Sequence, residues 1–143
     1  MARSHGFWKK WFLLTGAGGT TFWLANFAIS RTPLAAWYRA GLSIEVVPML
    51  LEALAGGLLI GAGVTAALLL FHDRLPGGSP LGKALLLSAL ALVLLTGLVE
   101  VPGKFLTGIP QAGQYFLVGL LINAIRIPAL GAGIGLLYDK VAE

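Results

Sequence analysis

The 143-residue sequence contains no cysteine and only two histidines. The missing thiols exclude disulfide bonds, thiolate-bound metals, iron–sulfur clusters and covalently attached c-type haem. A b-type haem held between helices normally takes two histidines within the spans. Here His5 precedes the first apolar stretch and His72 follows the second. No Ser-His-Asp set, metal-ligand cluster or deeply placed lysine stands in the apolar stretches, so we expect no cofactor and no metal, and we do not favour an enzyme.

Charge is also scarce. Only 11% of the residues are charged and 57% are hydrophobic, whereas a soluble domain carries roughly 25% charged residues. The net charge of +4 comes from cations spread over loops and helix ends. Binding to a nucleic-acid backbone requires cations gathered on one face, so no nucleic-acid partner is expected.

Four long stretches are nearly free of charge, at about 11–30, 46–71, 81–99 and 111–138. A helix of about 20 apolar residues crosses the roughly 30 Å hydrocarbon core of a bilayer. Four such helices leave no room for a soluble domain. The sequence therefore predicts an all-α integral membrane protein in which residues 1–143 form a single domain, a bundle of four transmembrane helices. The expected partners of such a protein include the lipid bilayer that surrounds it.

The segments between the spans predict further details. Aromatic and apolar residues recur at helical spacing over 34–45, which predicts a short interfacial helix after the first span. The first apolar run is longer than a signal-peptide core, so we expect it to be retained as a helix. Pro102 and Gly103, flanked by Glu100 and Lys104, predict that the third helix ends there.

Loop cations predict the orientation. Six of them fall on the side of the termini in a four-span topology: Arg3, Lys9, Lys10, Arg74, Lys83 and Lys140. The opposite side has three: Arg31, Arg39 and Lys104. Cytoplasmic loops carry the excess of cations. We therefore expect a plasma (inner) membrane protein with both termini in the cytoplasm.

Ionisable residues inside the spans are the candidates for function, because a charge in the bilayer is costly. Glu52, Glu100 and Arg126 qualify. At a rise of about 1.5 Å per residue, Arg126 falls near the middle of its helix and its side chain leans toward the depth of Glu52. Asn26 and Asn123 fall in the same outer half. The sequence predicts a polar cluster there, closed below by apolar residues.

This cluster has more than one interpretation. It is a ligand pocket in which Arg126 meets an anionic or polar group, or a buried Glu52–Arg126 ion pair that only supports the fold. A third possibility is that Arg126 pairs with a carboxylate of another protein. Small residues spaced four apart, at Gly57 and Gly61 and again at Gly131 and Gly135, predict close contacts between helices.

Two functions follow from these observations. The favoured one is a non-catalytic subunit or assembly partner of a larger membrane complex, or a homo-oligomer, because catalytic motifs are missing and the helix faces are rich in glycine. The alternative is a small transporter or ligand-binding membrane protein with an outward-facing polar pocket around Glu52 and Arg126. The direction of the Arg126 side chain separates them, since a pocket favours a ligand and a lipid-facing position favours a partner.

Overall fold

The computed structural model describes the backbone of residues 2–142 and the side chains of residues 5–141. The structure is 88% helical, and residues 2–142 contain no strand. Four helical segments are long and apolar enough to cross a membrane. The elements are α1 (Ala2–Ser30), α2 (Pro33–Gly41), α3 (Val46–Phe71), the 3-10 turn η1 (His72–Arg74), α4 (Pro80–Leu95), the π-helical turn η2 (Thr96–Glu100), α5 (Val101–Phe105) and α6 (Ala112–Ala142).

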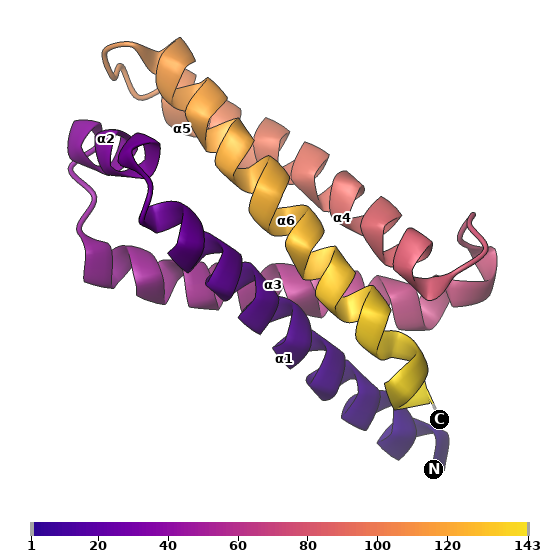
Figure 1. Ribbon diagram of the computed structural model, residues 1–143. Helices are drawn as coiled ribbons and strands as arrows, with labels where there is room; N and C mark the ends of the chain where they lie inside the picture. The colour runs from indigo at the N-terminus through magenta and orange to yellow at the C-terminus, as the bar shows by residue number, and fades with distance from the viewer. Residues whose placement is uncertain (1, 143) are drawn as a thin grey trace.

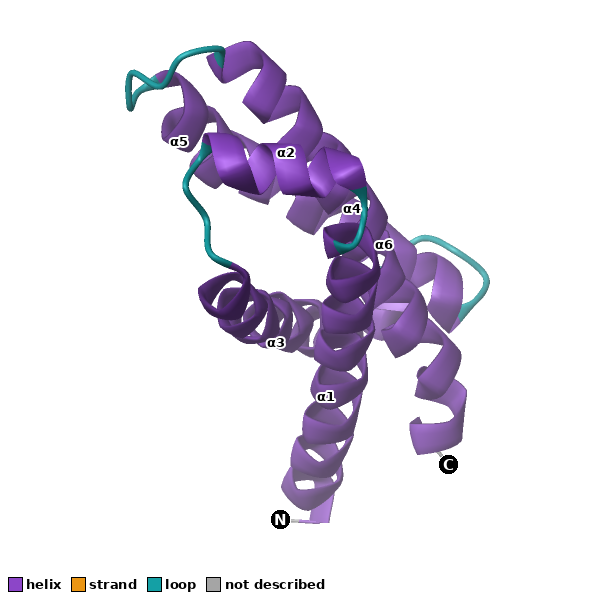
Figure 2. Cartoon of the chain, turned by 60° about the vertical axis from the view of Figure 1, so that its left-hand side comes forward, coloured by secondary structure: helices purple, strands orange, loops and turns teal. Residues whose placement is uncertain are grey.

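The bundle has two distinct ends (Figure 1). Both termini and η1 lie at one end, which we call the terminal end, while α2 and α5 lie at the other, the α2 end. α1 packs extensively on α3 and on α6, and α6 packs on α4. α3 and α4 meet near η1 and diverge toward the α2 end, where α2 lies across the end of α1 (Figure 2).

The prediction of four long apolar helices is confirmed. α3 has the predicted bounds of 46–71, and α6 occupies the place of the predicted fourth span. α1 begins at Ala2 rather than near residue 11. No proline or turn signal interrupts the chain before residue 11, so the charged and aromatic residues there extend the same helix.

The predicted end of the third helix at Glu100–Lys104 is wrong. The π-helical turn η2 follows α4 directly, and α5 follows η2, so one continuous helical segment runs from Pro80 to Phe105. Pro102 therefore lies inside this continuous segment, just after η2, where its missing N–H removes one backbone hydrogen bond. The wider turn at η2 absorbs the change of register that the proline requires.

Side chains of α2 and its flanks explain the short second helix. The Thr32 hydroxyl accepts a hydrogen bond from the Ala35 N–H (3.3 Å), and Pro33 occupies the first turn. This is a regular N-terminal cap. The helix ends before Ser43, which adopts a positive φ of 56°, and the chain then turns back into α3.

The outer surface of the bundle is apolar. Leu59, Leu98 and Leu106 expose 75%, 74% and 80% of their surface. In each of the four long apolar segments, no more than 33% of the most apolar window is buried inside the chain. The interior holds a small core that includes Leu14, Leu68 and Ile134. Water-soluble monomers rarely expose such continuous apolar surface.

Glycines bring the helices into contact. An added Cβ at Gly57 would lie 2.7 Å from Phe22 Cδ1, and one at Gly61 would lie 3.2 Å from the Thr15 carbonyl oxygen. On α6, an added Cβ at Gly131 would lie 2.9 Å from Ser88 Cβ, and one at Gly135 would lie 2.6 Å from Leu81 Cα. All four glycines singled out in the sequence therefore face helices of the same chain.

Candidate functional site

The most polar part of the interior lies at the α2 end, around Arg126 of α6. The Arg126 Nε donates a hydrogen bond to Asn123 Oδ1, and its Nη1 donates one to Asn26 Oδ1, both at 2.8 Å. The guanidinium carbon lies 4.7 Å from the centroid of the Phe22 ring. Asn123 and Asn26 expose only 1% and 4% of their surface. Arg126 thus points into the bundle, held by two neutral amides and one aromatic face.

A second charged group lies next to this network. The Glu100 carboxylate forms an ion pair with Lys104 Nζ at 3.1 Å, and both side chains are only 13% exposed. Asn123 Nδ2 donates to the other Glu100 oxygen at 3.5 Å. Lys104 Nζ also lies 5.3 Å from the ring centroid of Tyr38. Asn123 therefore connects the Arg126 guanidinium to the Glu100–Lys104 pair.

Local sequence explains how Glu100 reaches this position. It is the last residue of η2, and Lys104 follows four residues later on α5, the spacing at which side chains meet on one helical face. Gly119 of α6 leaves room for both the carboxylate and α2. An added Cβ there would lie 2.9 Å from Glu100 Oε2 and 3.1 Å from the Tyr38 hydroxyl.

These side chains border a pocket of about 70 Å³. This space is several times what one water molecule needs. Its lining comes from α1, α2, α3, η2, α6 and the segment before α3: Asn26, Ile29, Ser30, Ala35, Tyr38, Arg39, Ile44, Met49, Glu100, Gly119, Ile122, Asn123 and Arg126. α2 covers the pocket with Tyr38 and Arg39, and the Arg39 Nη1 donates to the Ser30 carbonyl oxygen at 3.0 Å.

The structure does not bring Glu52 to this site, which corrects the predicted Glu52–Arg126 pair. Glu52 is exposed on α3, and among the side chains of residues 5–141 none hydrogen-bonds to its carboxylate. The face of α3 that packs inward carries Ala53 and Gly57. Glu52 precedes Ala53 by about 100° of helix rotation and lies on the side of Leu59, which is 75% exposed. The predicted depth of Glu52 along the helix says nothing about this angle.

The other predicted residues do meet. Arg126, Asn123, Asn26 and Glu100 form one hydrogen-bonded network. Sequence reasoning missed Lys104, Tyr38, Arg39 and Met49 as members of the site. The spacing of Glu100 and Lys104 was a usable signal for their ion pair, but the helix break predicted between them concealed it.

Between the pocket and the terminal end, the interior of the bundle is mainly apolar. Phe22, Ile127 and Leu130 are buried between Arg126 and the terminal end. Further down, the Thr15 and Thr65 hydroxyls are buried without a hydrogen-bond partner among the described residues. Packed apolar side chains therefore separate the pocket from the terminal end, and α2 covers it at the opposite end.

No metal-binding group of three or more histidine, aspartate or glutamate side chains occurs among the described residues. The polar side chains of the pocket carry amides, a carboxylate, a phenol, the Ser30 hydroxyl and cationic groups. Groups of these kinds are suited to hold and orient a polar or anionic ligand. Comparison of the chain with protein-family models, curated proteins and solved structures finds no match.

Proposed function

We propose that the four long helices cross a lipid bilayer. Support comes from their length, which exceeds the roughly 20 residues that a span needs, and from the leucines that cover the outside of the bundle. A bilayer is the solvent in which such a surface is stable, whereas in water it would drive aggregation.

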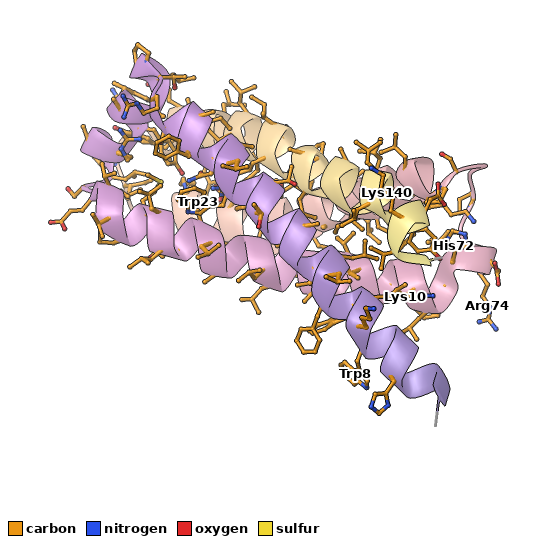
Figure 3. The ribbon with its side chains drawn as sticks, turned by 60° about the horizontal axis from the view of Figure 1, so that its bottom comes forward. Trp8, Lys10, Trp23, His72, Arg74 and Lys140 are labelled. Atoms are coloured by element: carbon orange, nitrogen blue, oxygen red, sulfur yellow. The ribbon has the colours of Figure 1, made fainter. Side chains whose placement is uncertain are left out.

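We also propose that the termini face the cytoplasm. Figure 3 shows Lys10, Arg74 and Lys140 gathered at the terminal end, as expected for the cytoplasmic side. At the α2 end, Arg39 and Lys104 are engaged with the pocket. The chain has no cysteine, so single-cysteine variants report position cleanly. In intact cells, an impermeant maleimide should label Ser43→Cys and not Gly78→Cys. The reverse pattern would invert the topology.

For the function itself, we propose that the protein binds a small anionic ligand in the pocket at the α2 end. The observation that carries this proposal is the environment of Arg126. Its guanidinium borders the pocket, and its hydrogen bonds go to two neutral amide oxygens. A guanidinium has further N–H donors, in a geometry that suits a carboxylate or a phosphate.

The charge balance supports the same proposal. Arg126, Arg39 and Lys104 lie in or beside the pocket, against one carboxylate, that of Glu100. Glu100 is already paired with Lys104. An arginine inside a bilayer costs about 2.5–3.5 kcal/mol even on lenient scales. Neutral amides solvate this charge without neutralising it, and a bound anion would do both.

Transport would require more than the pocket. The buried Phe22, Ile127 and Leu130 separate it from the terminal end, so passage of a ligand needs a second arrangement of the helices. Binding from the α2 end leaves the four long helices in place and passes only Tyr38 and Arg39 of α2. Ligand binding is therefore the proposal, and transport would be an extension of it.

The test uses ligand-dependent stability. The full chain in a neutral detergent is heated in sodium phosphate and in sodium chloride at equal ionic strength and pH. Phosphate should raise the thermal midpoint in a concentration-dependent way, because a ligand that binds only the folded state stabilises it. Arg126→Gln removes the cation, keeps hydrogen-bonding groups and should abolish the response.

Arg31→Gln is the matched control. Arg31 lies at the same end of the bundle but outside the pocket, where its guanidinium carbon lies 6.0 Å from the Phe27 ring centroid. This variant loses the same charge and should keep the phosphate response. If Arg126→Gln and the unchanged chain respond alike, or if both variants lose the response equally, the pocket is not the anion site.

A second candidate function, a subunit of a larger membrane complex, is favoured by Glu52. Its carboxylate is exposed on α3, in the first third of an apolar span. A carboxylate facing lipid is costly, and a basic or hydrogen-bonding residue of a neighbouring protein would lower that cost. The glycine faces no longer support this function, since they pack within the chain.

Gentle extraction followed by native mass spectrometry tests the second candidate. Co-release with other subunits at a fixed ratio, lost in Glu52→Leu, would support it. Release of the chain alone from both the unchanged protein and Glu52→Leu would exclude Glu52 as an assembly contact.

A further inference from the structure

An apolar groove lies between α3 and the α4–η2 segment. These elements diverge toward the α2 end (Figure 1). Its volume is about 380 Å³, far larger than the polar pocket. Every lining residue is apolar, including Leu59, Gly63 and Val64 from α3 and Ala91, Leu98 and Val99 from α4 and η2. Gly63 contributes open space, since an added Cβ there would meet nothing within 4 Å.

The groove and the pocket follow one another along the same two elements. On α3, Met49 borders the pocket, and Leu59 to Ala67 border the groove. On α4 and η2, Leu87 to Val99 border the groove, and the next residue, Glu100, borders the pocket. The two segments run in opposite directions, so on both of them the pocket lies toward the α2 end and the groove toward the bilayer centre.

This arrangement matches the orientation of a membrane lipid. A lipid places its polar head toward the interface and its chains toward the centre of the bilayer. The cationic pocket is at the level of the head and the groove is at the level of the chain. Charge complementarity with Arg126 and Arg39 requires the head to be anionic.

From this juxtaposition we infer that the ligand is an amphiphile of the bilayer, with an anionic phosphate or carboxylate head bound at Arg126 and an apolar chain in the α3–α4 groove. The inference rests on the proposed function and adds the class of ligand. The anionic head carries most of the affinity and the specificity for charge, and the tail adds affinity through packing in the groove.

The experiment compares probes that separate head from tail. The full chain is placed in phosphatidylcholine nanodiscs, and its thermal midpoint is followed with dodecyl phosphate, with dodecanol and with inorganic phosphate. Dodecyl phosphate should stabilise the protein at a small mole fraction of the lipid. Dodecanol, which has the same chain without the charge, should not.

Variants then separate the two sites. Gly63→Leu fills the groove and should raise the half-saturating mole fraction of dodecyl phosphate about tenfold, the effect of overfilling a packed site. Its response to inorganic phosphate should not change. Gly56→Leu is the matched control, because Gly56 is on the same helix, does not border the groove and also has open space around an added Cβ. It should bind dodecyl phosphate like the unchanged chain.

Ala91→Leu narrows the same groove from α4 and should repeat the effect of Gly63→Leu, so the test does not depend on the folding of one variant. If both groove variants bind dodecyl phosphate normally while Arg126→Gln abolishes the response, the groove holds no tail and only the inference fails. If Arg126→Gln keeps the response, or dodecanol matches dodecyl phosphate, the anion site fails and the proposed function fails with it.

Discussion

The two halves of the bundle are built from different contacts. In the half toward the terminal end, helices approach through glycine, as at Gly131 against Ser88 and Gly135 against Leu81. In the half toward the α2 end, the same helix α6 carries Asn123 and Arg126, whose contacts with α1 and with Glu100 of η2 are polar. One helix therefore forms a tight apolar joint at one end and the wall of a polar pocket at the other.

This difference shows how a small helical bundle can hold a polar pocket. Close packing of α6 on α4 near the terminal end fixes the positions of both helices. At the α2 end, η2 changes the helical register between α4 and α5, α2 covers the pocket, and Gly119 leaves space for Glu100. The rigid half positions the side chains of the open half.

The largest expected loss in the free energy of unfolding comes from a substitution in the pocket. Glu100→Gln leaves Lys104 without its carboxylate beside Arg126. Removing one member of a buried ion pair costs about 3–5 kcal/mol. Since both side chains remain 13% exposed, we expect the lower end of that range, measured as the free energy of unfolding in mixed detergent micelles.

Lys104→Met is the companion variant for that measurement. The double variant Glu100→Gln, Lys104→Met removes both charges and should recover most of the lost stability, because the coupling of two residues appears as non-additivity. If the two single variants add without coupling, the ion pair does not support the α2 end.

The next largest loss in the free energy of unfolding is expected from a substitution in the half toward the terminal end. Gly135→Ala places a Cβ 2.6 Å from Leu81 Cα, so α4 and α6 must separate. Overfilling a packed interior costs about 1–3 kcal/mol, and the same unfolding titration measures it. Gly63→Ala is the control, because the space around Gly63 is open and alanine favours a helix. Equal stability of the two variants would show that the glycine joint is not tight.

The smallest expected loss of stability comes from one tryptophan hydrogen bond in each half, and the two losses compare the halves directly. Trp11 Nε1 donates to the Ala62 carbonyl oxygen toward the terminal end, and Trp23 Nε1 donates to the Leu50 carbonyl oxygen toward the α2 end, both at 3.1 Å. Figure 3 shows Trp23 near the α2 end. Trp11→Phe and Trp23→Phe should each cost about 1 kcal/mol, the net value of one hydrogen bond. A much larger loss for one of them, in the same titration, would show that the α1–α3 contact is stronger in that half.

Glu52 and Glu100 show what sequence reasoning achieved at the site. Both carboxylates were found because ionisable residues are rare in apolar stretches, and the depth of Glu52 along its helix followed from the helical rise. Pairing requires a second quantity, the angle around the helix axis, and that depends on which faces pack. The close approach of α1 at Ala53 and Gly57 turns Glu52 outward, while η2 turns Glu100 inward.

Composition and run length alone determined that the chain is all-helical, with four long apolar helices and no cysteine-based chemistry, because these properties depend only on which residues are present and how far each apolar run extends. The rotation of each helix, the unbroken third span and the meeting of Arg126 with Asn26, one hundred residues apart, were decided only by the tertiary structure. They depend on contacts between side chains of different helices, and no local stretch of sequence contains that information.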